Sequence, residues 1–199
     1  MRAKGFRRRE GMRRGVYLLP NLCTTASLFC GFYSIIKSIS GEFQAAAWAI
    51  LLAGIFDLLD GRVARLAKAE SEFGIEYDSL CDLASFGLAP GILVYTWSLY
   101  GLQKLGWLAA FIFFACGALR LARFNVQHDD VEVEFFQGLP IPIAAYVVAT
   151  YVIFHHHLFV FPPEGSIAAA AMTMLLGLLM VSTIRYRSMK MVDLRSRNS

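Results

Sequence analysis

Long uncharged segments constrain the fold of this chain more than any other feature. Four segments contain no Asp, Glu, Lys or Arg, and each is long enough to cross a bilayer as a helix: 16–36, 83–103, 138–163 and 165–184. Two shorter apolar runs, Phe43–Phe56 and Leu105–Leu119, each end directly before a charged residue. The chain is 57% hydrophobic and only 17% charged, which leaves too little polar surface for a soluble domain of 199 residues. We therefore predict one all-α membrane domain.

The distribution of basic residues predicts how this domain is oriented. The six apolar segments predict six transmembrane helices, at roughly 17–38, 42–66, 74–101, 104–124, 138–160 and 166–187. Of the 19 Lys and Arg residues, 17 then fall on the side of the termini, and only Lys37 and Lys104 fall on the other. Basic residues favour the cytosolic side, so we expect a multi-pass protein of the cell (plasma) membrane with both termini in the cytosol.

The expected organisation is a basic N-terminal tail over 1–15, a six-helix domain over 16–187 and a C-terminal tail over 188–199. Seven basic residues lie between Arg2 and Arg14. A basic tail can bind nucleic acid, but beside an apolar segment it is more typical of a flank that faces anionic lipid. We expect membrane lipids, and no nucleic acid, as its partners.

Some residues that often bind metals are better explained here by packing. Cys23, Cys30, Cys81 and Cys116 all lie in apolar segments and form no CxxC pair, which favours small buried hydrophobic side chains over a disulfide or a metal site. The run His155–His157 lies near the outer end of the fifth predicted helix, where interfacial packing is the expected role.

Four aspartates form the most informative pattern in the sequence. Asp57 and Asp60 are three residues apart, and Asp78 and Asp82 are four apart, so each pair shares one face of a helix. A short connection joins the second and third predicted helices, which can therefore pack antiparallel. Their inner ends would then bring the four carboxylates together.

The depth of these aspartates in the membrane indicates a function. Asp57 lies 14 residues after Phe43, or roughly 21 Å of helical rise, which places it in the inner leaflet. Ionisable groups at such a depth are costly and usually functional. Four close carboxylates need cations to stay ionised, and two Mg²⁺ or Mn²⁺ ions would balance them and could clamp a diphosphate. Two alternatives are helix-end charges paired with Arg62, Arg65 and Lys68, and a divalent-cation transporter, which should also carry polar groups through the outer half of the membrane.

Residues next to the aspartates are suited to a phosphate-containing substrate. Gly61 and Gly74 remove side chains where a substrate has to approach the backbone closely. Arg65 lies one turn beyond Gly61 and is always charged, so it can hold phosphate oxygens.

Residues 57–82 resemble the signature of the CDP-alcohol phosphotransferase family, D-x-x-D-G-x-x-A-R-x8-G-x-x-x-D-x-x-x-D, at every fixed position. The element Pro20-Asn21-Leu22-Cys23-Thr24 resembles the family's PN-x-x-T element. The resemblance covers about 16–187. It implies six transmembrane helices, a homodimer, two divalent metal ions and a polar cavity that faces the cytosol.

The resemblance also implies individual roles. Asp57 and Asp78 would bridge both metals, Asp60 would complete one metal site, and Asp82 would complete the other and act as the general base. The residues expected to bind the CDP-lipid are Asn21, Thr24, Gly61, Arg65, Ser71 and Gly74. For Asn21, N-terminal capping of the first helix is an open alternative.

Four further stretches are similar to the small integral-membrane phosphatidylserine synthases within that family: 20–36, 85–91, 119–125 and 136–142. The implied reaction transfers a phosphatidyl group from CDP-diacylglycerol to L-serine and releases CMP. Arg120, Arg123 and Asn125 are the candidates to bind the acceptor, although both arginines could instead extend to the membrane surface. Glycerol 3-phosphate and an inositol phosphate remain alternative acceptors, but their phosphate should require more basic residues than the last three helices offer.

Overall fold

The computed structural model describes residues 4–67, 72–128, 135–159, 162–183 and 185–187. The helices in this part of the chain are α1 (Lys4–Ile39), α2 (Phe43–Ala67), α3 (Glu72–Asp82), the π-helix η1 (Leu83–Leu88), α4 (Ala89–Trp97), the 3-10 helix η2 (Leu99–Leu102), α5 (Lys104–His128), α6 (Ile141–Leu158) and α7 (Ile167–Val181). Two short strands, β1 (Phe135–Gln137) and β2 (Arg185–Arg187), pair antiparallel. The prediction of an all-α fold is confirmed, with this small ladder as an addition.

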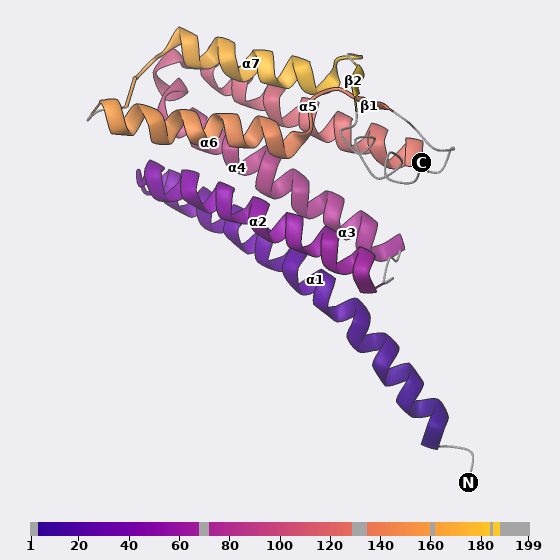
Figure 1. Cartoon of the computed structure of the whole chain (residues 1–199). Helices are drawn as coiled ribbons and strands as arrows, with labels where there is room; N and C mark the ends of the chain where they lie inside the picture. The colour runs from indigo at the N-terminus through magenta and orange to yellow at the C-terminus, as the bar shows by residue number, and fades with distance from the viewer. Residues whose placement is uncertain (1–3, 68–71, 129–134, 160–161, 184, 188–199) are drawn as a thin grey trace, which may run out of the picture.

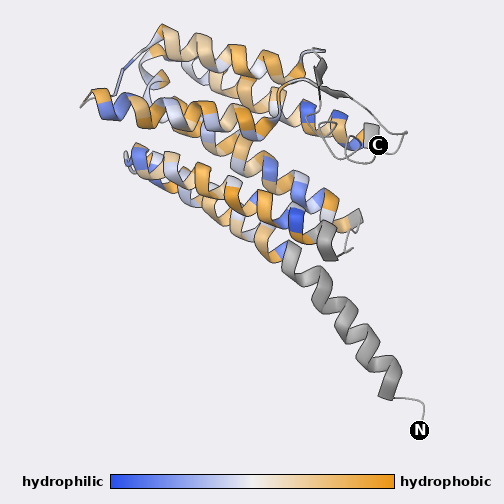
Figure 2. Ribbon diagram, viewed as in Figure 1, coloured by the Kyte–Doolittle hydropathy of each residue, from blue (hydrophilic) through white to orange (hydrophobic). Residues whose placement is uncertain are grey.

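The helices have the length and composition of a multi-pass membrane protein. Five helical segments are long and apolar enough to cross a membrane: Asn21–Ile39, Phe43–Val63, Phe73–Trp97, Lys104–Val126 and Ile141–Leu158. The helix α7 is a shorter apolar helix. Figure 2 shows hydrophobic residues along most of the coloured length of the long helices, with hydrophilic ones mainly toward the ends of the bundle. The six predicted spans therefore correspond to these six apolar segments.

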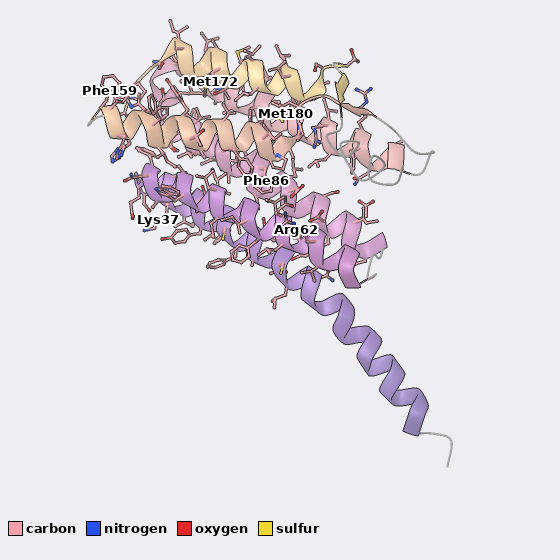
Figure 3. All side chains as sticks on the ribbon, in the orientation of Figure 1. Lys37, Arg62, Phe86, Phe159, Met172 and Met180 are labelled. Atoms are coloured by element: carbon pink, nitrogen blue, oxygen red, sulfur yellow. The ribbon has the colours of Figure 1, made fainter. Side chains whose placement is uncertain are left out.

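Two groups of helices pack face to face (Figure 1). The helices α1 and α2 form a hairpin, whose turn contains Gly41 at a φ of 78°, a left-handed conformation that glycine adopts readily. The helices α5 and α7 pack together on the other side, and α6 packs against α2. Phe86 of η1 is fully buried between the two groups (Figure 3). Ser85 beside it donates a hydrogen bond to the Ser27 carbonyl of α1, which ties the third span to the first.

The third predicted helix is interrupted immediately after Asp82. Residues Leu83–Leu88 form a π-helix, and the backbone N–H of Ala89 bonds to the carbonyl of Ala84, five residues earlier. Pro90 follows and has no N–H to donate, so the ordinary α-helical pattern cannot continue through this point. A π-helical turn re-registers the faces of a helix and often accompanies a functional site. Gly91 also approaches another helix, since a Cβ there would lie 3.5 Å from the Ala110 carbonyl oxygen.

Aromatic rings and backbone bonds close the end of the bundle farthest from the aspartates. His155 packs edge-on against Trp97, with ring centroids 5.1 Å apart, and also contacts Phe159. This confirms the packing role expected for His155. The Ser98 hydroxyl donates to the Pro163 carbonyl at 2.6 Å, and the Gly165 N–H donates to the Ser98 carbonyl at 2.8 Å. The α6–α7 turn is thereby fixed against the end of the third span.

Two predicted helix ends were wrong. The first helix begins at Lys4 rather than near residue 17, so Asn21 is inside α1 and is not an N-cap. Helix α7 ends at Val181 rather than near 187, because Ser182 turns to an extended conformation (φ −59°, ψ 152°). The chain then reaches β2, which pairs with β1. In the uncharged segment 165–184 the helix thus ends before Ser182 and Thr183, which are not helical.

Candidate active site: a carboxylate cluster between α2 and α3

The helical spacing of the aspartates brings them to one place, as predicted. Oxygen atoms of Asp57, Asp60 and Asp78 all lie within 4.8 Å of one another, which makes this group a candidate metal site. Asp82 is one turn beyond Asp78, and its carboxyl group is hydrogen-bonded to that of Asp57. Two carboxyl groups in such contact either share a proton or share a cation. All four acidic side chains therefore belong to one site between α2 and α3.

Asp60 gives the most direct indication that this site accommodates a cation. Its side chain is only 5% exposed. The Thr24 hydroxyl and the Gly61 backbone both hydrogen-bond to this carboxylate. Its second oxygen, Oδ2, is buried and has no hydrogen-bond partner among the described residues. A buried carboxylate oxygen without a partner costs free energy. Such an oxygen is a preferred ligand of hard divalent cations. The donor set thus fits Mg²⁺ or Mn²⁺, the ions predicted from the four aspartates in the sequence.

Space for a ligand exists next to the cluster. A Cβ added to Gly61 would meet no atom of the described residues within 4 Å, the backbone of its own helix apart. Thr24 of α1 reaches the cluster through Asp60, whereas Asn21 is half-buried one turn earlier on the same helix. Gly74 lies at the start of α3, one turn before Asp78. The roles of these residues in binding the CDP-lipid remain predictions.

Two of the predicted CDP-binding residues cannot be located at the site. Ser71 lies outside the described residues, and so does the side chain of Arg65, although its backbone belongs to α2. Lys68, one of the possible charge partners of the aspartates, is also outside them. Arg62, another of those partners, is exposed. No ion pair between Arg62 and an aspartate occurs in the described part of the chain.

The three predicted acceptor-binding residues on α5 have different surroundings. Arg120 is partly buried and interacts electrostatically with Asp82. Its Nε atom is buried and has no hydrogen-bond partner within the described ranges. Asn125 instead exchanges hydrogen bonds with Ser79 of α3, at 3.1 and 3.2 Å, and its amide also reaches Glu76 at 3.5 Å. Arg120 therefore points toward the cluster, while Asn125 links α5 to α3.

Sequence reasoning missed one polar residue of the site, Tyr146. This tyrosine belongs to α6, and its side chain interacts electrostatically with Asp57 and Asp82. It lies far from the signature in sequence, within an apolar helix, where a single tyrosine is ordinary. The sequence contains one indirect sign, a glycine at position 54, one turn before Asp57. In the structure the Tyr146 hydroxyl occupies the space that a Cβ of Gly54 would fill.

The cysteines take no part in a cross-link. All four are free thiols, with Cys30 and Cys81 buried and Cys23 and Cys116 half-buried. Cys81 lies between Asp78 and Asp82 in the sequence. These environments agree with the role predicted for the cysteines, that of small hydrophobic side chains.

Comparison with known proteins identifies the group to which this site belongs. A relative in Helicobacter pylori, named CDP-diacylglycerol–serine O-phosphatidyltransferase, is 40% identical over 177 residues, which cover 89% of this chain and 75% of the relative. A Bacillus subtilis protein of the same name is 36% identical over 126 residues, or 63% of this chain and 70% of that protein. The archaetidylserine synthase of Methanothermobacter thermautotrophicus is 36% identical over 170 residues, or 84% of this chain and 69% of that protein.

The family match covers nearly the whole membrane domain and contains every residue of the carboxylate cluster. Residues 17–184 match the family described as CDP-alcohol phosphatidyltransferase. The resemblance seen in residues 57–82 is thereby confirmed, and a match of this extent argues against a cation transporter. The chain belongs to the CDP-alcohol phosphatidyltransferase family.

Proposed function

We propose that this protein transfers a phosphatidyl group from CDP-diacylglycerol to L-serine, forming phosphatidylserine and CMP. The observation that carries the proposal is the set of four aspartates gathered between membrane helices in a chain of this family. The relatives named for the transfer to serine, at 40% and 36% identity, support serine as the acceptor. Archaetidylserine synthase, another relative, is also named for a serine-containing lipid.

The carboxylates would hold two divalent ions, Mg²⁺ or Mn²⁺. Asp57, Asp60 and Asp78 would bind one ion, and Asp82 would bind the second together with Asp57 and Asp78. Bound there, the ions would neutralise the diphosphate of CDP-diacylglycerol and stabilise the charge that develops during the transfer. The buried Oδ2 atom of Asp60 supports this assignment, because the described residues give it no other partner.

The nucleotide of the lipid substrate would bind beside this cluster. The open space next to Gly61 can accept a phosphate or ribose close to the helix backbone. Asn21 and Thr24 on α1, together with Gly74 at the start of α3, would line the same cavity. Arg65 and Ser71 complete the proposed set, by their positions in the family signature alone.

Arg120 would bind the carboxylate of the serine. A guanidinium group is suited to a carboxylate, which it can bind through two parallel hydrogen bonds. The unpartnered Nε of Arg120 and its interaction with Asp82 support this role. Arg123, one turn further along α5, and Asn125 would be supporting residues at the edge of the acceptor site.

Asp82 would take the proton from the serine hydroxyl as the oxygen attacks the β-phosphorus. A serine hydroxyl is a weak nucleophile at neutral pH, so a positioned base is needed. Asp82 interacts electrostatically with Arg120 of α5 as well as with Asp57 of α2. The acceptor hydroxyl and the base would thus meet at the α5 side of the cluster. The bond from the β-phosphorus to the CMP oxygen breaks, and CMP leaves.

The proposal includes a location and an assembly. The asymmetry of Lys and Arg along the chain supports a plasma-membrane protein whose active site faces the cytosol. The family resemblance supports a homodimer. Labelling of single cysteines introduced at positions 37 and 62 from each side of the membrane would test the orientation, and mass measurement in detergent would test the dimer.

The acceptor is tested with the purified protein in detergent, CDP-diacylglycerol and Mg²⁺. L-serine, glycerol 3-phosphate and an inositol phosphate are supplied in parallel, and CMP and the lipid product are measured. We expect CMP release and phosphatidylserine with L-serine only. Product from glycerol 3-phosphate or the inositol phosphate would favour an alternative acceptor. Absence of CMP together with metal flux in proteoliposomes would favour a transporter.

A further inference from the structure

Tyr146 approaches the carboxylate cluster from a helix that carries none of the aspartates. It belongs to α6, which packs against α2. Its ring contacts Phe86 edge-on, with centroids 6.0 Å apart. Phe86 is completely buried, so this contact restricts where the tyrosine ring can lie. The ring is thus held from one side, and its hydroxyl end is directed toward α2.

The hydroxyl end of Tyr146 fits a gap left by a glycine. A Cβ on Gly54 would lie 1.8 Å from the Tyr146 hydroxyl oxygen and 2.5 Å from Cζ, distances that no real side chain could tolerate. Only glycine at position 54 leaves room for the hydroxyl against the backbone of α2. Asp57 is three residues further along the same helix, on the same face. The glycine therefore places the hydroxyl one helical turn from a predicted metal ligand.

The hydroxyl proton has a charged group available as its acceptor. Asp57 and Asp82 are the charged groups with which the Tyr146 side chain interacts electrostatically. The Tyr146 side chain is half-buried, and a tyrosine hydroxyl that is removed from water usually forms a hydrogen bond. Carboxylates that bind a metal are in turn usually held by hydrogen bonds from a second layer of residues.

We propose that Tyr146 is a positioning residue that donates its hydroxyl hydrogen bond to the Asp57–Asp82 carboxylate pair and orients this pair for metal binding. Gly54 is the position that makes this contact possible. The inference rests on the proposed metal-dependent function. Tyr146 acts on the carboxylates and contacts no substrate.

The test compares Tyr146→Phe with Tyr151→Phe in the purified full-length protein. Both substitutions remove one hydroxyl from α6, but the Tyr151 ring packs against Trp97 and His155 at the far end of the bundle. Metal binding is measured without turnover, as the rise in unfolding temperature during titration with Mn²⁺ or Mg²⁺. The metal requirement for CMP release is measured in parallel.

We expect Tyr146→Phe to raise the half-saturating metal concentration about tenfold in both measurements, as is usual for the loss of such an outer partner. The KM for CDP-diacylglycerol at saturating metal should change less than about twofold, and Tyr151→Phe should behave as wild type. A Tyr146→Phe titration midpoint equal to that of wild type would overturn the inference, even if the unfolding temperature in chelator is lower. Because the titration requires no turnover, a wild-type protein that binds metal but releases no CMP would contradict the proposed function and not this role of Tyr146.

Discussion

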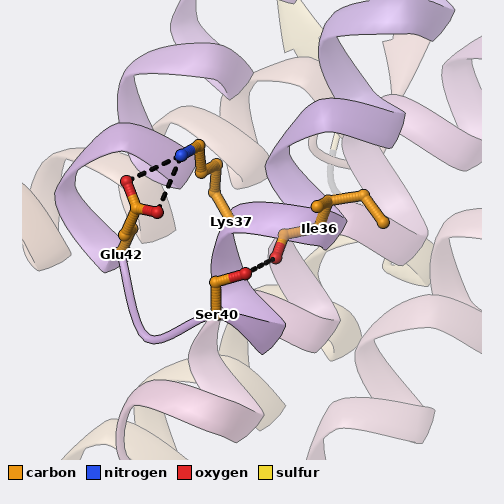
Figure 4. A network of polar contacts seen from close by, with 4 residues as sticks. All are labelled: Ile36, Lys37, Ser40 and Glu42. Atoms are coloured by element: carbon orange, nitrogen blue, oxygen red, sulfur yellow. Dashed lines mark hydrogen bonds and ion pairs between the residues drawn. The ribbon is translucent and has the colours of Figure 1, made fainter.

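Charged side chains at one end of the helix bundle are paired with an opposite charge, whereas those near the other end are gathered with like charges. At the end that contains the α1–α2 turn, Lys37 and Glu42 form an ion pair at 2.7 Å (Figure 4). Lys37 also lies over the Tyr33 ring. Near the other end, Asp57, Asp60 and Asp78 place oxygen atoms within 4.8 Å of one another, and Asp60 is almost fully buried. A charge that serves only the fold can be neutralised by a neighbour, as Lys37 is.

This difference indicates where a functional site should be sought in a membrane protein. Like charges gathered between apolar helices repel one another, and desolvation raises the cost further. Such an arrangement is stable when a bound cation supplies the opposite charge. Here the family match and the fit of the oxygen ligands indicate that divalent metal ions supply this charge. Arg120 and Arg123 of α5 are described cations at this end of the bundle, and both are proposed to bind substrate rather than to neutralise the aspartates.

Neutralising one acidic side chain at each end should give the largest difference in CMP release. Asp57→Asn and Asp78→Asn would each weaken both proposed metal sites, so we expect CMP release to fall on the order of 10³-fold or more. Glu42→Gln breaks the ion pair with Lys37 but leaves the cluster intact, and its activity should stay within about twofold of wild type. Equal losses at the two ends, measured at matched protein concentration, would remove the distinction between them.

Asp82→Asn separates metal binding from proton transfer within the cluster. The amide retains an oxygen that can bind a metal, but it cannot accept a proton. We expect kcat to fall on the order of 10²-fold or more, as for other general bases, while CDP-diacylglycerol still binds. Both quantities should be measured on the same purified variant. Turnover near that of wild type would exclude Asp82 as the base, and lost lipid binding would indicate that it mainly holds metal.

The two arginines of α5 should differ in their effect on serine. Arg120→Gln would remove charge-assisted hydrogen bonds to the serine carboxylate, so we expect the KM for serine to rise about tenfold or more. The KM for CDP-diacylglycerol should change much less. Arg123→Gln should have the smaller effect on serine, because Arg120 carries the unpartnered buried Nε. A larger increase for Arg123→Gln would reverse this ranking.

The smallest effect is expected at the ion pair of the opposite end. Lys37→Met removes the cation, and exposed ion pairs contribute little to stability. We expect the unfolding temperature in detergent to fall by no more than about 2 °C, with serine transfer unchanged. A loss of transfer in this variant would mean that the two ends are coupled.

The features that were predicted from the sequence depend on local periodicity. The uncharged segments predicted the spans, because the length of a helix that crosses a bilayer is fixed. The spacings of Asp57 to Asp60 and of Asp78 to Asp82 predicted shared helix faces. A short connection between the two helices then predicted one cluster. Each of these steps needs only neighbouring residues.

The features that were missed depend on contacts between distant segments. The end of α7 at Val181 depends on the pairing of β2 with β1, about 50 residues earlier in the chain. Tyr146 joins the cluster only through the packing of α6 on α2. The π-helix after Asp82 was also missed. The strand pairing and the packing of α6 on α2 both join segments that are far apart in the sequence, so no local pattern predicts them.

The central claim is that the aspartate cluster works through bound divalent ions, and metal removal tests it most directly. Purified protein is stripped with excess chelator, and CMP release from CDP-diacylglycerol and L-serine is measured before and after Mg²⁺ or Mn²⁺ is restored. The account predicts that activity disappears in chelator and returns with either ion in wild type, but does not return in Asp57→Asn. Full CMP release in excess chelator would contradict it.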